Sequence, residues 1–134
     1  MHDNVQNYLN KFYENLNVCQ YSYLGGHYNA SASRYYYALR LMVNAYFKKK
    51  GIEGERVPDS SGIMREKWRH GDLIDKVHEY LRDEIPDIAD LLLDAKEIRE
   101  KGDYDGVPVR KNQLNSVRKR CKKVIKVMFR EIKD

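Results

Sequence analysis

The segment from Arg99 to Asp105 gathers the residue types that phosphate chemistry uses. It closes an apolar, helix-like stretch with an arginine and then places a tyrosine between two aspartates. An arginine at a helix end, beside a hydroxyl and carboxylates, can hold a phosphate or support proton transfer. A structural interpretation fits equally, because Asp103 and Asp105 can form Asx turns while Arg99 pairs locally. These residues alone leave both interpretations open.

His70 is the histidine best placed for acid–base chemistry. It precedes a Gly-Asp pair at an expected helix start, where a side chain can project into a cleft and titrate near neutral pH. A purely structural histidine is the alternative. The other histidines, His2, His27 and His78, have no cysteine or carboxylate at a metal-ligand spacing, and no glycine-rich phosphate loop is present. We therefore expect neither a metal site nor a cofactor.

The expected last helix is strongly basic, and the chain as a whole has a formal net charge of +5. At 100° per residue, four of its cations share one face, and such a row can follow a phosphate backbone. These candidate nucleic-acid-binding residues are Lys111, Arg118, Lys122 and Lys126. A solvated outer face with no ligand is the alternative interpretation.

The element expected to position these groups is a central helix from Ala30 to Gly51. Asn29 or Ser31 is its expected N-cap, and Gly51 supplies a left-handed stop. Small side chains on the helix let a neighbouring backbone approach closely, so we expect it to contact more than one helix. The predicted apolar stripe consists of Ala30, Tyr37, Ala38, Leu41, Met42, Ala45 and Tyr46.

Apolar periodicity predicts a first helix that begins at an Asp3 or Asn4 cap and ends near Gln20. The Gly25-Gly26 pair then turns the chain into the central helix. Residues 52–62 contain two glycines, a proline and a Ser-Ser pair, and we expect a mobile loop there, with no strand. The buried face of this first helix is expected to be Val5, Tyr8, Leu9, Phe12 and Leu16.

Three further helices complete the expected architecture. The third begins at Ser61 or, after a break at Gly71, at an Asp72 cap; the fourth is capped by Asp87 and ended by Gly102. The fifth spans about twenty residues. Their expected core faces are Leu73, Ile74, Val77 and Leu81; Ile88, Leu91, Leu92, Ala95 and Ile98; and Leu114, Val117, Cys121, Val124, Ile125, Met128 and Ile132.

The 134 residues therefore predict a single domain, residues 1–134, built as an all-α bundle of about five helices. No segment has the apolar length of a membrane span, and the N-terminus lacks the pattern of a secretory signal. Cys19 and Cys121 are isolated beside apolar stripes, which is typical of reduced core thiols. We expect a cytoplasmic protein.

Three features together resemble the HEPN superfamily of small all-α domains. They are the Ala-Ser-Arg-Tyr-Tyr-Tyr-Ala run at the start of the central helix (residues 32–38), the His70-Gly71 start of the third helix, and Arg99-x-x-x-Asp103-Tyr104-Asp105 before the last helix. Many members carry an Arg-x4–6-His motif, and one such string runs from Arg65 to His70, but it lies ahead of the third helix. The chain is more similar to a variant subgroup with Arg-x-x-x-Asp-Tyr in place of that motif.

The resemblance implies a bundle that forms a homodimer and, in many members, a metal-independent endoribonuclease. Carried over residue by residue, Arg99 matches the motif arginine that stabilises the phosphorane. His70 is our candidate for the group that activates the ribose 2′-hydroxyl, and Asp103 and Tyr104 are candidate orienting groups. The implied setting is a prokaryotic toxin–antitoxin or defence-type system, with RNA as ligand.

A second hypothesis belongs to a different functional class. The chain is then a non-catalytic interaction subunit whose protein partner is a minimal nucleotidyltransferase or another protein. Arg99, Asp103 and Tyr104 become structural, and an aromatic surface around Tyr35 and Tyr36 holds the partner. Convergence of His70 with Arg99 in an open cleft distinguishes the catalytic hypothesis from this one.

Overall fold

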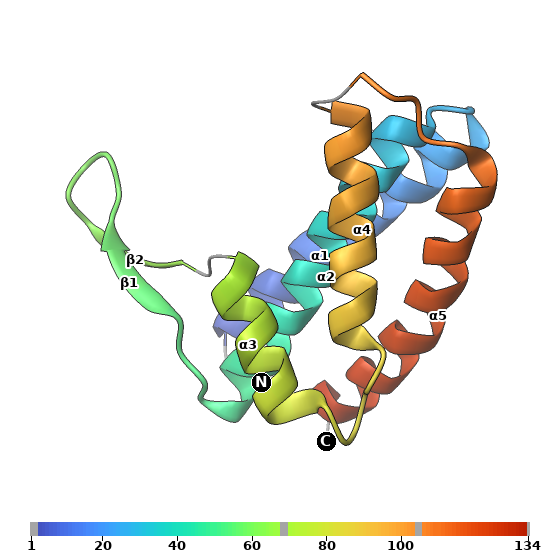
Figure 1. Ribbon diagram of the computed structural model, residues 1–134. Helices are drawn as coiled ribbons and strands as arrows, with labels where there is room; N and C mark the ends of the chain where they lie inside the picture. Colours follow the sequence, from blue (N-terminus) through green and yellow to red (C-terminus); the bar gives the residue numbers. More distant parts are fainter. Residues whose placement is uncertain (1–2, 68–69, 104–105, 134) are drawn as a thin grey trace.

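The computed structural model describes residues 3–67, 70–103 and 106–133. These residues form five helices and one short hairpin (Figure 1), so the predicted all-α bundle is confirmed. In chain order the elements are α1 (Asp3–Leu24), α2 (Tyr28–Lys50), β1 (Glu55–Pro58), β2 (Met64–Lys67), α3 (His70–Leu81), α4 (Ile88–Asp103) and α5 (Lys111–Lys133).

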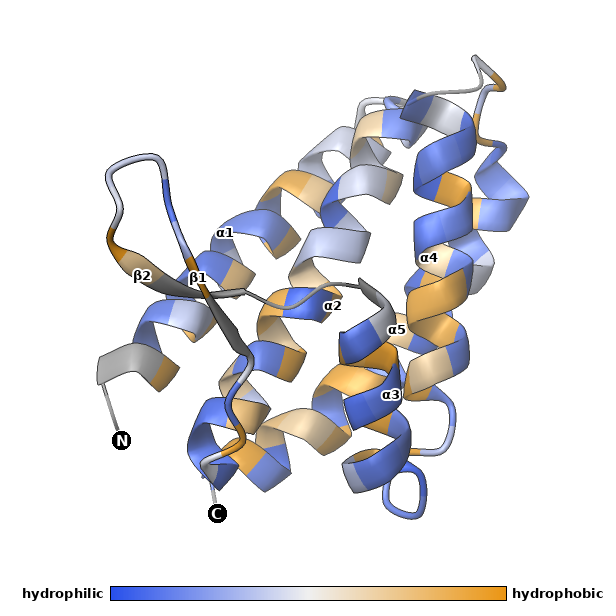
Figure 2. Cartoon of the chain, turned by 60° about the vertical axis from the view of Figure 1, so that its left-hand side comes forward, coloured by the Kyte–Doolittle hydropathy of each residue, from blue (hydrophilic) through white to orange (hydrophobic). Residues whose placement is uncertain are grey.

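The central position predicted for α2 is confirmed, because this helix packs against α1, α4 and α5. Contact with three helices buries a wide arc of its surface, and the buried face is therefore broader than the predicted stripe. Tyr35 and Tyr36 are buried, whereas Tyr37, a member of the predicted stripe, is 38% exposed. Ala30 is exposed as well. Figure 2 shows apolar residues gathered where the helices face one another.

The N-terminal end of α2 differs from the prediction. His27 occupies the N-cap position and its side chain makes no capping hydrogen bond. The two predicted caps serve tertiary contacts instead: Asn29 Oδ1 accepts the backbone N–H of Val109, and Ser31 Oγ donates to the carbonyl of Cys19. The C-terminal prediction is confirmed, since Gly51 has φ of 73° and its N–H reaches the Lys48 carbonyl.

Two predicted helix ends are wrong. α1 continues one turn past Gln20, to Leu24, and α4 continues through Gly102 to Asp103. Gly102 does not have a positive φ, so it is not a left-handed stop. A Cβ atom at Gly102 would lie 3.1 Å from the Asn29 side chain and 3.1 Å from Val109. The absence of a side chain there lets the end of α4 approach both segments closely.

The expectation of no strand in residues 52–62 is also wrong. β1 and β2 pair antiparallel, with Glu55 opposite Lys67 and Pro58 opposite Met64. Asp59 organises the turn, because its Oδ1 accepts the backbone N–H groups of Ser61 and Ile63. The hairpin projects away from the bundle (Figures 1 and 2). Hydrogen bonds within the turn stabilise the hairpin. The sequence lacks the alternation of apolar and polar residues that would have predicted its strands.

α3 starts at His70, not at Ser61 or Asp72, and its predicted core face of Leu73, Ile74, Val77 and Leu81 is buried. The core faces predicted for α4 and α5 are buried too, apart from the partly exposed Ile98 and Ile125. Cys19 and Cys121 are free and buried, as expected. Among the helices described, none has the length and apolar character that crossing a membrane requires.

Candidate functional site

Arg99 lies in the last turns of α4 and reaches across to α2. Its Nη2 donates to the Tyr37 hydroxyl at 2.8 Å, and its guanidinium carbon lies 4.9 Å from the centre of the Tyr37 ring and 5.4 Å from that of Tyr36. Its Nε lies 3.5 Å from Asp103 Oδ2, and the Arg99 side chain is 15% exposed. The arginine is thus oriented by two aromatic rings, a hydroxyl and a carboxylate.

The sequence explains how these groups meet. Arg99 and Asp103 are four residues apart on α4, a spacing that places the two side chains on one helix face. The local pairing predicted for Arg99 is therefore present. Tyr36 and Tyr37 come from the middle of α2, the helix on which α4 packs. Cations are also favoured at this end of α4, because the helix carbonyls there carry partial negative charge.

Arg40 joins the same cluster, and the sequence interpretation missed it. Its guanidinium carbon lies 5.8 Å from the centre of the Tyr36 ring, and its Nη1 lies 3.4 Å from the Tyr36 hydroxyl. The available signal was its position four residues after Tyr36, which places an arginine over the ring on a helix. We refer to Arg40, Arg99, Tyr36, Tyr37 and Asp103 as the α4 cluster.

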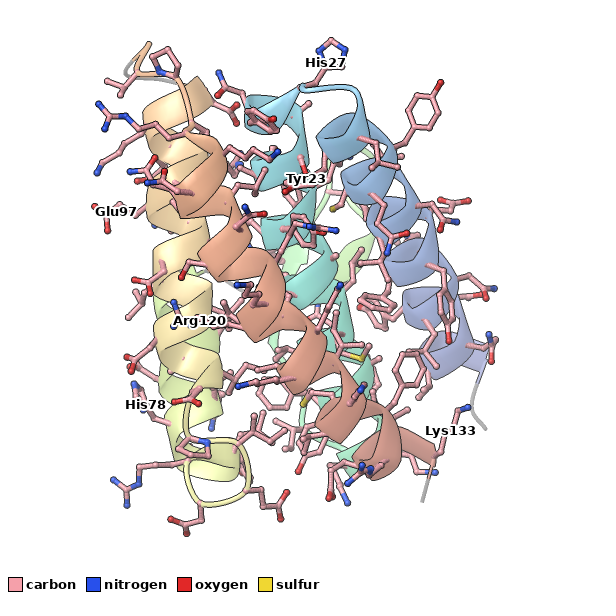
Figure 3. The ribbon with its side chains drawn as sticks, turned by 90° about the vertical axis from the view of Figure 1, so that its right-hand side faces the viewer. Tyr23, His27, His78, Glu97, Arg120 and Lys133 are labelled. Atoms are coloured by element: carbon pink, nitrogen blue, oxygen red, sulfur yellow. The ribbon has the colours of Figure 1, made fainter. Side chains whose placement is uncertain are left out.

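Arg118, a predicted RNA-binding residue, belongs to a second cluster at the junction of α1, α2 and α5. Its guanidinium carbon lies 3.9 Å from the centre of the Tyr23 ring, and its Nε donates to the Tyr35 hydroxyl at 3.1 Å. The Tyr23 hydroxyl donates to Asn115 Oδ1 at 2.5 Å. Figure 3 labels Tyr23 in this region, beside α5. We refer to Arg118, Tyr23, Tyr35 and Asn115 as the α5 cluster.

Burial raises the pKa of Tyr35, and the hydrogen bond and positive charge of Arg118 oppose that rise in pKa. The phenol is therefore neutral at physiological pH, and its oxygen is available as the acceptor for Arg118. An arginine that links side chains of three helices in this way has a clear structural role.

The predicted basic row of α5 divides into two pairs. Lys111 and Arg118 lie near Tyr23, with Lys111 Nζ 5.9 Å from its ring centre, while Lys122 and Lys126 are exposed. The neighbouring Arg120 pairs with Asp94 of α4 at 2.5 Å, and Figure 3 shows it between the two helices. Lys111, Lys122 and Lys126 are thus the members of the row that face solvent, and Arg118 is half-buried.

Two predicted catalytic residues are not described at the site. Tyr104 lies outside the described residues, and for His70 the structure describes the helix start but not the side chain. Convergence of His70 with Arg99 therefore stays a prediction.

The prediction of an aromatic surface around Tyr35 and Tyr36 is wrong, because these residues are 4% and 2% exposed. Tyr37 presents the accessible ring instead. Among the described residues, no group of three His, Cys, Asp or Glu side chains is arranged to hold a metal ion.

Comparison with protein-family models gives a match to the HEPN domain over residues 5–132. The chain belongs to the HEPN domain family. The resemblance inferred from the residues is thereby confirmed, and a five-helix bundle is consistent with this family. Comparison with curated proteins gives no match. Membership in the HEPN family supports a broad functional class, that of ribonucleases and of partners of nucleotidyltransferases.

Proposed function

We propose that this HEPN domain binds RNA and cleaves it without a metal ion, as a cytoplasmic homodimer in a prokaryotic toxin–antitoxin or other defence-type system. Family membership supports the ribonuclease class. The observation that carries the proposal for this chain is the fixed orientation of Arg99 at the end of α4, beside a hydroxyl and a carboxylate.

In the proposed reaction the 2′-hydroxyl oxygen of the ribose attacks the adjacent phosphorus, and the bond from phosphorus to the 5′-oxygen breaks. His70, from either protomer, removes the proton of the 2′-hydroxyl. Arg99 stabilises the negative charge that develops on the phosphorane oxygens, while Asp103 and Tyr104 orient the reacting groups. Water or the protonated His70 returns a proton to the 5′-oxygen, so atoms and charges balance.

Lys111, Arg118, Lys122 and Lys126 provide the proposed RNA-binding charge along α5. The exposed Lys111, Lys122 and Lys126 contact phosphates directly in this proposal, whereas the half-buried Arg118 keeps that part of the surface positive while it packs on Tyr23. RNA affinity should then fall steeply as the salt concentration rises.

The test is cleavage of total and structured RNA in the presence of EDTA by the wild type, Arg99→Ala and His70→Ala. The control is Arg34→Ala, an exposed arginine of α2 that bonds to Asn15 and lies outside both clusters. We expect cleavage by the wild type and the control, and its loss in both site variants. Wild-type cleavage that survives Arg99→Ala would refute the assignment, and absence of wild-type cleavage would refute the ribonuclease.

The alternative is a non-catalytic subunit that binds a minimal nucleotidyltransferase. One observation favours it: only 15% of the Arg99 side chain is exposed, as expected for a structural arginine. Size-exclusion chromatography with a minimal nucleotidyltransferase would then give a stable complex, and Arg99→Ala would lower the unfolding midpoint without affecting any RNA cleavage.

A further inference from the structure

Three aromatic rings meet where the C-terminal half of α5 lies beside α1. The ring centre of Phe129 lies 5.9 Å from that of Phe12 and 5.7 Å from that of Tyr13. Phe12 is fully buried, whereas Phe129 is partly exposed and Tyr13 is 45% exposed. The buried ring packs edge-on against Phe129 and fixes its position, while Tyr13 and Phe129 keep part of their surface open to solvent. We refer to these three residues as the ring cluster.

A second contact between the same two helices lies at the far end from the ring cluster. Arg118 of α5 packs there on the ring of Tyr23 of α1, at 3.9 Å. Ten residues separate Tyr13 from Tyr23 on α1, and eleven separate Arg118 from Phe129 on α5. The two contacts therefore keep the helices antiparallel and side by side over about 15 Å. Figure 3 faces this side of the molecule, with Tyr23 near one end and Lys133 near the other.

Phe129 lies within the basic row of α5. At about 100° per residue, one face of the last turns of this helix carries Lys122, Lys126, Phe129 and Lys133. The three lysines are exposed, and Lys133 Nζ lies 5.5 Å from the centre of the Phe129 ring. Glu131 projects from the opposite side of the helix from Lys122. This face thus presents a cation about one turn before the ring and another one turn after it.

Alternation of lysines with accessible rings suits an unpaired, single-stranded nucleic acid. The bases of a single strand are free to stack on aromatic side chains, while the phosphates on either side of each base meet the cations. Tyr13 and Phe129, whose ring planes differ by 34°, can contact one base together. A duplex stacks its bases internally and would use the lysines alone. Lysine is depleted at the centres of protein interfaces, so the flanking lysines favour RNA over a protein partner.

We propose that Tyr13 and Phe129 form a stacking platform for an unpaired base of RNA, and that Lys126 and Lys133 bind the phosphates on its two sides. The inference rests on the proposed function only for the identity of the ligand as RNA. It specifies a single-stranded segment as the part of the RNA that is recognised. It also adds Tyr13, Phe129 and Lys133 to the basic row that the sequence predicted.

The platform is tested with a single-stranded oligodeoxynucleotide that carries one 2-aminopurine. This probe lacks the 2′-hydroxyl and cannot be cleaved, and stacking on an aromatic ring tolerates any base. We expect the wild type to bind it and to quench the 2-aminopurine fluorescence. Tyr13→Ala should weaken binding about tenfold and remove most of the quenching. Tyr21→Ala is the matched control, because this tyrosine is 83% exposed and lies about 12 Å further along α1.

Phe129→Leu is the second variant, because it keeps an apolar side chain against the buried Phe12 and removes the ring face. It should also weaken binding and quenching. The two ring variants should retain the salt dependence of binding, whereas Lys126→Ala with Lys133→Ala should lower the slope of log K against log salt by roughly 0.7 for each phosphate contact removed. A ring cluster with a purely structural role would change the melting temperature and leave the quenching unaltered.

Wild-type affinity and quenching in both ring variants would overturn the platform, and loss of nucleotidyltransferase binding in those variants would then assign this face to a protein partner. Tighter binding of a duplex than of its single strand would overturn it as well. If the wild type quenches the probe, the ring variants do not, and no RNA is cleaved, the platform stands and the proposed ribonuclease fails. RNA cleavage by ring variants that bind the probe normally would support the ribonuclease and exclude the platform.

Discussion

The α4 cluster and the α5 cluster are built from consecutive tyrosines of α2, yet they hold their arginines differently. Arg118 of the α5 cluster lies 3.9 Å from a ring centre and donates to the buried Tyr35. Arg99 of the α4 cluster lies farther from its two rings, at 4.9 Å and 5.4 Å, and donates to Tyr37, which is 38% exposed.

From this comparison we infer that Arg118 serves packing and propose that Arg99 serves chemistry, because the groups that surround the two arginines differ. The α5 cluster joins three helices through one cation. Both of its tyrosine hydroxyls are hydrogen-bonded within the cluster, that of Tyr35 to Arg118 and that of Tyr23 to Asn115. The α4 cluster holds a second cation, Arg40, and includes Tyr37, which is partly exposed. We therefore expect changes in the α5 cluster to affect stability and changes in the α4 cluster to affect ligand binding.

The largest expected effect on stability is that of Arg118→Ala. The change removes a close cation–π contact and leaves the buried Tyr35 hydroxyl without its donor, for a loss of about 2–3 kcal/mol. Urea denaturation should show the loss, and the melting temperature should fall by roughly 5–10 °C. Arg99→Ala, measured in parallel, should lower the unfolding free energy less than Arg118→Ala does and the RNA affinity more. The reverse order would contradict the distinction between the two clusters.

Removal of single hydroxyls sharpens the same comparison. Tyr35→Phe should cost about 1 kcal/mol of unfolding free energy, since Arg118 loses a buried acceptor. Tyr37→Phe should cost less than about 0.5 kcal/mol, because the residue is partly exposed, yet it should weaken binding of an oligonucleotide by loosening Arg99. The two variants differ from the wild type by the same atom, so each controls for the other. Equal stability losses would show that the clusters do not differ in this way.

Burial raises the pKa of both thiols, Cys19 on α1 and Cys121 on α5, the latter to about 12 from 9.0. An acid whose pKa is higher in the folded state contributes stability that is complete below its unfolded pKa and is lost as pH rises above it. Between pH 8 and pH 10 the Cys121 thiol alone should lower the unfolding free energy by about 1 kcal/mol. Urea titrations at both pH values measure the loss, and Cys121→Ala should reduce it. An equal unfolding free energy at the two pH values would mean that the Cys121 thiol is open to solvent.

The smallest effect on folding is expected for Lys122→Glu with Lys126→Glu. Both residues are exposed, so the melting temperature should stay within about 2 °C of the wild type. RNA affinity should fall, and the slope of log K against log salt should decrease by roughly one per phosphate contact removed. The double variant Lys11→Glu with Lys50→Glu, at two exposed lysines outside α5, makes the same change in net charge and is the control. An equal loss of affinity in that control would exclude a specific α5 surface.

Much of the local structure followed from the order of residues. Apolar periodicity gave the core faces of α3, α4 and α5, and Gly51 marked the end of α2, because these features depend on helix geometry and backbone sterics alone. The sequence also predicted Arg99 as a candidate site residue and the resemblance to the HEPN family.

The tertiary structure decided which polar residue serves which purpose. Asn29 and Ser31 resemble helix caps locally, but distant chain segments use them as acceptor and donor. Gly102 resembles a stop signal, and its role emerges only where α4 approaches Asn29 and Val109. Arg40 and Arg118 acquire their partners when helices far apart in sequence pack together, and a linear pattern does not specify which ring a long, flexible cation will meet.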